Sequence, residues 1–143
     1  MARRNRSVER TVLAFYTAMP KYFRQFALDI REIIRAVKNY TLLSYQEAVA
    51  QYGVSMEDVM ARCESEVGCV FKTGDTYVIM YNDADDIPEG KKRFTLAHEL
   101  AHIVLRHFEI VEADKIAENI HFDTMLERES DNFAACLLCP CQC

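Results

Sequence analysis

Residues 93–107 read RFTLAHELAHIVLRH and contain His98-Glu99-Leu100-Ala101-His102, the pattern H-E-x-x-H. On a helix, residues four positions apart lie on one face, so the imidazoles of His98 and His102 can reach one metal ion. Zinc bound in this way lowers the pKa of a water molecule to about 7, and the carboxylate of Glu99 can accept its proton. The pattern therefore predicts a zinc centre with His98 and His102 as ligands and Glu99 as general base.

The flanks of the motif predict that its helix is buried. An H-E-x-x-H pattern that arose by chance on a surface helix would leave its side chains in water, whereas ionisable groups inside a core need a partner or a metal. The other positions of this stretch are mostly apolar: Phe94, Leu96, Leu100, Ala101, Ile103, Val104 and Leu105. The zinc interpretation is therefore preferred to a chance match.

A zinc centre of this type needs a third protein ligand. One extended form of the motif, H-E-x-x-H-x-x-G-x-x-H, would supply a histidine, but Leu105 and Phe108 occupy the two diagnostic positions. His107 lies five residues after His102, so on a continuous helix it points elsewhere and is interpreted as a C-terminal residue favoured by the helix dipole. The third ligand is therefore expected on the next helix.

That next helix includes the stretch ERESDNFAACLL from residue 127 onwards. Glu127 and Asp131 are four residues apart on one face, which suits a metal ligand and a carboxylate that orients a metal-bound histidine. Glu129 is the rival ligand on another face. A structural alternative is that Thr124 and Glu127 form a capping box. Glu127 is the preferred third ligand, with Asp131 in the surrounding shell.

The first half of the chain is predicted to be helical. Within residues 23–37, apolar side chains recur mostly at steps of three and four, as on one buried helix face. Ser44 and Glu47 have the spacing of a capping box, and Gly53 is a suitable C-terminal stop. Ser55, which is followed by acidic residues, is expected to start another short helix.

The second half of the chain changes character. Residues 67–71 and 77–81 are rich in β-branched and aromatic side chains around a Thr-Gly-Asp turn, which predicts a β-hairpin. A polar loop is expected over residues 82–90, and helices over about 91–107 and 124–138. The resulting fold class is α+β.

The length of 143 residues fits a single domain, and half of the residues are apolar, enough for a core. Residues 1–65 are expected to be the helical part of this domain and residues 66–143 the part that contains the zinc centre.

The net charge of −5 argues against non-specific binding of nucleic acid, which needs clustered Lys and Arg. The one basic cluster is interpreted as a solvated tail: Arg3, Arg4, Arg6 and Arg10. No apolar run is long enough to span a bilayer, and residues 11–19 suit an amphipathic helix better than a signal peptide. A cytoplasmic location with no membrane association is expected.

The six cysteines are not expected to form a disulfide framework in that compartment. Cys63 and Cys69 are isolated in the sequence. Four more crowd the end of the chain, where they are interpreted as apolar helix residues and a frayed terminus rather than a second zinc site: Cys136, Cys139, Cys141 and Cys143.

Two ordered motifs within residues 77–140 resemble the ImmA/IrrE family of metallopeptidases. The first is the run RFTLAHELAH, preceded by a strand ending in Tyr81-Asn82 and a charged loop. The second is Glu127-x-x-x-Asp131-x-Phe133-Ala134-Ala135-x-Leu137-Leu138-x-Pro140, which is similar to the family signature E-x-x-A-N/D-x-F-A-A-x-L-L-x-P. Ser130 stands where the family usually has Ala. The resemblance covers a little under half of the chain.

The resemblance implies a zincin-like fold with Zn²⁺ held by His98, His102 and Glu127, and with Glu99 as general base. It also implies a role, because family members typically cleave a helix-turn-helix repressor and so release genes of a mobile element or a stress response. The expected partner is therefore such a repressor, acting as protein substrate. Many relatives continue beyond Pro140, and that segment is expected to help complete the substrate cleft.

Two other functions compete with the zinc endopeptidase. The helices expected at 44–52 and 55–65 could form a helix-turn-helix that binds DNA, although their acidic residues are unusual in a recognition helix. Alternatively, the chain could be a non-catalytic zinc-binding interaction module, but a purely structural zinc would not need Glu99. The group that stabilises the oxyanion is open, with Tyr81 as one candidate and a core position as the simpler interpretation of this residue.

Overall fold

The computed structural model describes residue 8 and residues 10–14, 29–113 and 122–138. It divides the chain into two compact units, one made of residues 30–100 and the other of residues 1–29 with 101–143. The division falls within one helix. The predicted amphipathic helix at 23–37 lies partly outside the described residues; its described part is α3 (Ile30–Ala36).

A three-stranded sheet is the centre of the unit formed by residues 30–100. Strands β2 (Gly68–Thr73) and β3 (Thr76–Tyr81) form an antiparallel hairpin, which confirms the prediction from the sequence. Strand β1 (Tyr40–Ser44) pairs with β3 in parallel, so the order is β1-β3-β2. The expectation that residues 1–65 are purely helical is therefore wrong at β1.

Helix α4 (Tyr45–Tyr52) begins and ends where the sequence predicts, and α5 (Met56–Cys63) begins there but ends two residues before the expected residue 65. The Ser44 hydroxyl accepts from the Glu47 amide, and the Glu47 carboxylate accepts from the Ser44 amide, so the capping box is complete. Gly53 ends α4 in the left-handed conformation, at φ 63°. Ser55 caps α5 by accepting a hydrogen bond from the amide of Asp58. Local signals of this kind are satisfied within one helical turn, which is why the sequence reveals them.

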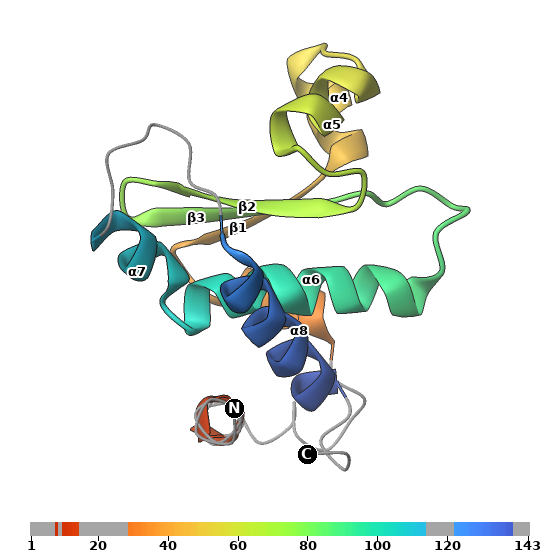
Figure 1. The fold of residues 1–143 in the computed structure, drawn as a ribbon. Coiled ribbons are helices and arrows are strands. Elements are labelled where there is room, and N and C mark those ends of the chain that lie inside the picture. Colours follow the sequence, from red (N-terminus) through yellow and green to blue (C-terminus); the bar gives the residue numbers. More distant parts are fainter. Residues whose placement is uncertain (1–7, 9, 15–28, 114–121, 139–143) are drawn as a thin grey trace. The chain divides into compact units, whose positions relative to one another are not determined.

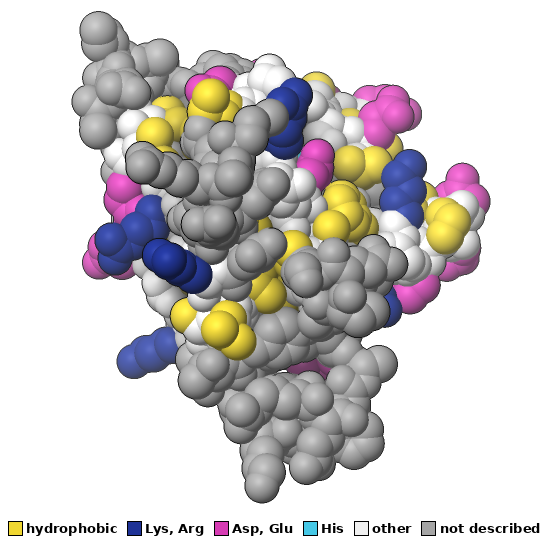
Figure 2. Space-filling model, turned by 60° about the horizontal axis from the view of Figure 1, so that its bottom comes forward, with side chains coloured by type: hydrophobic (Ala, Val, Ile, Leu, Met, Phe, Trp, Pro, Cys, Tyr) yellow, Lys and Arg dark blue, Asp and Glu magenta, His cyan; other side chains and the backbone are white. Residues whose placement is uncertain are grey.

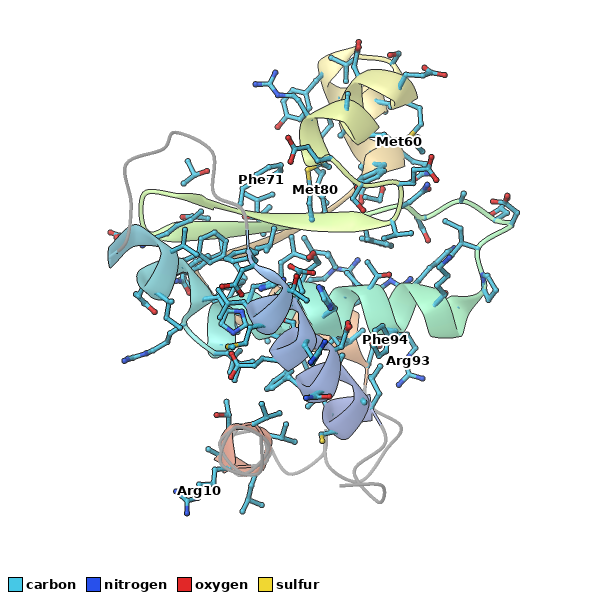
Figure 3. The ribbon with its side chains drawn as sticks, viewed as in Figure 1. Arg10, Met60, Phe71, Met80, Arg93 and Phe94 are labelled. Carbon is cyan, nitrogen blue, oxygen red and sulfur yellow. The ribbon has the colours of Figure 1, made fainter. Side chains whose placement is uncertain are left out.

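One face of the sheet packs against α4 and α5 (Figure 1). The centre of this core is formed by Tyr45, Ala48, Val59 and Met80, all buried. Met60 on α5 packs against the same cluster, on the side of the sheet where Figure 3 labels both Met60 and Met80. Because side chains alternate along a strand, the neighbours of Met80, Ile79 and Tyr81, are buried on the opposite face.

Helix α6 (Glu89–Val104) carries the H-E-x-x-H motif, and its part up to Leu100 runs along that opposite face (Figure 1). Leu96 and Leu100 are fully buried, whereas Phe94 is exposed and projects away from the sheet (Figure 3). The contact between α6 and β2 is close: a Cβ atom built on Gly68 would lie 2.5 Å from Cγ2 of Thr95 and 2.9 Å from the carbonyl oxygen of Met80. A side chain at position 68 would push the strand and the motif helix apart.

The other unit contains the last turn of α6, followed by α7 (His107–Ala113) and α8 (Thr124–Leu138). The continuous helix predicted over about residues 91–107 is therefore wrong at its C-terminal end. It starts at Glu89 and stops at Val104, and Arg106 adopts the left-handed conformation at φ 62° before α7 begins. Residue 8 and residues 10–14 are helical, with Val8 and Val12 buried.

None of the helices in the described ranges has both the length and the hydropathy needed to cross a membrane. On the face that Figure 2 shows, the Lys and Arg side chains of the described residues are interspersed with Asp and Glu rather than gathered into one basic patch.

The close approach at Gly68 yields a stability prediction. We expect Gly68→Ala to lower the free energy of unfolding by about 1–3 kcal/mol, because the added methyl group overpacks the contact between β2 and α6. Gly90→Ala is the matched control, since nothing lies within 4 Å of a Cβ built at that helical position. Chemical denaturation of both variants measures the difference, and equal stability of the two would contradict the constraint at Gly68.

Candidate metal centre

Helix α6 brings together the three residues of the motif. His98, Glu99 and His102 each offer a ligand atom, and these atoms lie within 4.8 Å of one another. The exposed fraction is 7% for Glu99 and 1% for His102. Two imidazoles and a carboxylate at this spacing on a buried helix face form a donor set that suits zinc.

Glu127 lies on the first turn of α8 with its Oε1 atom 2.9 Å from Nε2 of His102. A bare imidazole nitrogen and a carboxylate oxygen both present lone pairs, so at this distance they repel unless a proton or a metal cation holds them together. The alternative role of Glu127 in a capping box with Thr124 is wrong, because Asp123 caps this helix by accepting from the amide of Leu126 at 2.9 Å. The position of Glu127 therefore suits a metal ligand.

His107 is placed against His102, contrary to the expectation that it points elsewhere. Its Nδ1 atom lies 2.9 Å from Nδ1 of His102, and its Nε2 atom lies 3.1 Å from Oε1 of Glu129. The physical reason is the turn at Arg106, which ends α6 and directs the first residue of α7 back towards the motif. Glu129, the rival ligand considered from the sequence, is instead the partner of His107.

Two further residues surround the ring of His102. The hydroxyl oxygen of Ser130 lies 3.1 Å from its Nδ1 atom and 3.5 Å from Nδ1 of His107, and Ser130 is fully buried. The ring of Phe122 stacks on that of His102, with centroids 4.0 Å apart and an interplanar angle of 11°. These contacts fix the plane of the imidazole and leave it little freedom to rotate.

Burial, followed by the proximity of His102, lowers the pKa of His107 despite the opposing effect of Glu129. A charged imidazolium would have to be accommodated with no exposed surface, since His107 is 0% exposed. The neutral form, with one protonated and one bare nitrogen, is therefore favoured at position 107.

In the other unit, Glu99 acts electrostatically on the core of the sheet. Burial raises the pKa of the Tyr45 hydroxyl, and the neighbouring thiols of Cys69 and Cys63 and the carboxylate of Glu99 raise it further. The hydrogen bond that the Cys69 thiol donates to Cys63, together with burial, raises the pKa of Cys69, again with a contribution from Glu99. The Tyr45 hydroxyl and the Cys69 thiol are therefore kept neutral, so these two groups add no charge around the predicted general base.

Cys63 and Cys69, isolated in the sequence, lie together as free thiols in this core. Cys136 on α8 is disulfide-bonded, contrary to the expectation of an unpaired apolar position. The interpretation of Cys139, Cys141 and Cys143 lies outside the described residues.

Two of the site residues considered from the sequence occupy other environments. Asp131 is exposed on α8, one turn after Glu127, and its role beside a metal-bound histidine stays a prediction. The hydroxyl group of Tyr81 accepts a hydrogen bond from Nε of Arg31 at 3.3 Å, and the ring is buried, as expected of a core tyrosine.

The comparisons with known proteins agree with the motif. The model of the family Peptidase_M78, described as an IrrE N-terminal-like domain, matches residues 64–142. This match spans the hairpin, α6, α7 and α8, and therefore all four predicted site residues from His98 to Glu127. No curated protein and no solved structure shows significant similarity to the chain.

The metal centre yields a prediction for zinc content. We expect about one zinc ion per wild-type chain by elemental analysis, and its loss in His98→Ala and in His102→Ala, because two ligands are too few to hold the ion. The triple variant Cys139→Ser, Cys141→Ser, Cys143→Ser is the control and should keep its zinc. Zinc that persists in both histidine variants but disappears in the control would instead assign the metal to the terminal cysteines.

Proposed function

The chain belongs to the Peptidase_M78 family, and from this premise we propose that it is a zinc-dependent endopeptidase. The family indicates a metallopeptidase-like function. The observation that supports the specific proposal is the group formed by His98, Glu99 and His102, whose ligand atoms lie within 4.8 Å of one another on a largely buried helix face.

Each residue of the centre has a distinct role in this proposal. His98 and His102 bind the metal from successive turns of α6, and Glu127 completes the set of three protein ligands from α8. A zinc ion in such a site polarises the scissile carbonyl and lowers the pKa of water to about 7. The remaining chemistry belongs to the protein, which must exclude bulk water, hold its ligands in place and transfer protons.

Glu99 is proposed to perform the proton transfers. Its carboxylate accepts a proton from the attacking water as the new bond to the carbonyl carbon forms, and it can return this proton to the amide nitrogen when the peptide bond breaks. Its burial, with 7% exposed, keeps the transfer away from bulk solvent. The thiol and phenol groups that feel its field remain neutral and do not compete as bases.

The proposed substrate is a helix-turn-helix transcriptional repressor, which would make the protein an antirepressor of a mobile element or a stress response. This part of the proposal rests on the resemblance of the two motifs to the ImmA/IrrE family. A cytoplasmic location follows from the same proposal, because the repressor acts there.

Direct DNA binding by the chain is the weaker alternative. Helices α4 and α5 do form two consecutive helices with a short turn, but Tyr45, Ala48 and Val59 are buried in the core of the sheet. The first turn of α5, which would have to approach phosphates, carries Glu57 and Asp58. These two helices are better explained as packing elements of the domain.

The general base can be tested without knowing the substrate. We expect Glu99→Gln to keep its zinc and to lower hydrolysis by about 100-fold or more, because the amide cannot accept the proton. The measurement is mass spectrometry of new protein N-termini in a lysate of the source cells, incubated with the zinc-loaded wild type or with the variant. Glu57→Gln, a change of an exposed glutamate on α5, is the matched control.

New N-termini that appear with the wild type and the control, but not with Glu99→Gln, would support the proposal and identify the substrate. Equal cleavage by Glu99→Gln would refute its role as base. Zinc binding by the wild type without any new N-terminus would favour the non-catalytic zinc-binding module.

A further inference from the structure

The buried ring of His102 has a different partner at each of its nitrogens. On one side, Nε2 faces the Glu127 carboxylate at 2.9 Å. On the other side, Nδ1 faces Nδ1 of His107 at 2.9 Å, and His107 in turn contacts Glu129 at 3.1 Å. The three side chains His102, His107 and Glu129 therefore form a continuous chain of contacts that begins at Nδ1 of His102, on the side of the ring opposite the metal-facing nitrogen.

The order of protons along this chain is restricted. The Glu129 carboxylate can only accept, so Nε2 of His107 must donate to it. Two imidazole nitrogens at 2.9 Å require one donor and one acceptor, so the proton between the rings belongs either to His102 or to His107. In one of these two arrangements Nε2 of His102, the nitrogen that faces the metal, is bare, and in the other it carries the proton.

If His102 donates from Nδ1, then His107 is neutral with a bare Nδ1 atom, and a neutral His102 presents a bare Nε2 atom. A bare Nε2 lone pair is what a metal ligand needs. If His107 donates instead, it carries protons on both nitrogens and is a cation. A neutral His102 then carries its proton on Nε2, where the proton prevents this nitrogen from binding the metal. Burying an imidazolium at 0% exposure is costly, even beside one carboxylate.

We propose that His107 and Glu129 are positioning residues that hold the proton of His102 on Nδ1 and so present its Nε2 lone pair to the metal. This inference rests on the proposed zinc centre and adds to it two residues that touch neither the metal nor the substrate. The stack of Phe122 on His102 assists, because it opposes the rotation that would exchange the two ring nitrogens.

Ser130 provides a second acceptor for the same proton. Its oxygen lies 3.1 Å from Nδ1 of His102, slightly farther than Nδ1 of His107 at 2.9 Å. Because a hydroxyl group can donate as well as accept, Ser130 alone cannot decide which nitrogen of His102 carries the proton. The tautomer of His102 is therefore determined by His107 and Glu129, because the Glu129 carboxylate can only accept a hydrogen bond.

Zinc affinity, measured by competition with a chelator, tests the proposal. We expect His107→Phe to weaken affinity by about 10- to 100-fold, in the range usual for residues that orient a metal ligand. His107→Asn should restore most of the affinity, because its side-chain oxygen can accept from His102. Glu129→Gln should give an intermediate loss, and Glu109→Gln, on an exposed residue of α7, is the matched control with no loss.

A second measurement reports the tautomer directly and does not depend on activity. In the zinc-loaded wild type, ¹⁵N NMR of the imidazole rings should show the proton of His102 on Nδ1, where it is donated to His107. In zinc-loaded Glu129→Gln the hydrogen bond that this Nδ1 donates to His107 should weaken, because a neutral amide can donate as well as accept and no longer fixes which nitrogen of His107 is bare. Thermal melting of the zinc-free variants identifies any that are unfolded, and Glu129→Gln then carries the test if His107→Phe fails to fold.

The outcomes separate this inference from the proposed function. Absence of zinc binding by the wild type would refute the metal centre itself. Zinc binding that is unchanged in folded His107→Phe and in Glu129→Gln, or a zinc-loaded wild type in which Nδ1 of His102 carries no proton, would overturn the positioning role while leaving the centre in place. A larger loss in Ser130→Ala than in His107→Phe would transfer the role to Ser130.

Discussion

A neutral imidazole has one donor and one acceptor, and His102 is buried at 1% exposure, so both of its nitrogens must be satisfied by the protein or by a metal. The surrounding structure is arranged around this requirement. Arg106 ends α6 early in the left-handed conformation, which directs His107 back to the ring. The cap at Asp123 starts α8 four residues before Glu127, whose carboxylate then faces the other nitrogen.

The features that were predictable from the sequence are those whose interactions are local. The capping box of Ser44 and Glu47, the stop at Gly53 and the hairpin around Gly74 are each satisfied within a few residues. The H-E-x-x-H motif belongs to the same class, since the spacing of its side chains is a property of one helix. The family match covers residues 64–142, which include the hairpin and the motif helix among these features.

The features that escaped prediction depend on contacts between distant segments. Strand β1 has only five residues, most of them partly exposed, and its partner lies far along the chain, so neither alternation nor a turn signal marks it. The role of His107 depends on a non-glycine residue, Arg106, adopting a positive φ value, which no sequence pattern announces. Glu129 could be recognised as its partner only once His107 had been placed. The assignment of the metal ligands stays a prediction, which rests on the spacing of the motif and on the proximity of its side chains.

The parallel pairing of β1 with β3 has a consequence for how the chain folds. Tyr40 pairs with Tyr77, so the two strands can join only after a long loop containing α4, α5 and β2 has closed. The hairpin of β2 and β3 needs only a two-residue connection, and the capped helices form from neighbouring residues. Because the entropic cost of closure rises with loop length, the local elements should form first and β1 should join last, making its docking the slow step. Until then one edge of β3 stays open, and this is when the chain is most exposed to pairing with another copy.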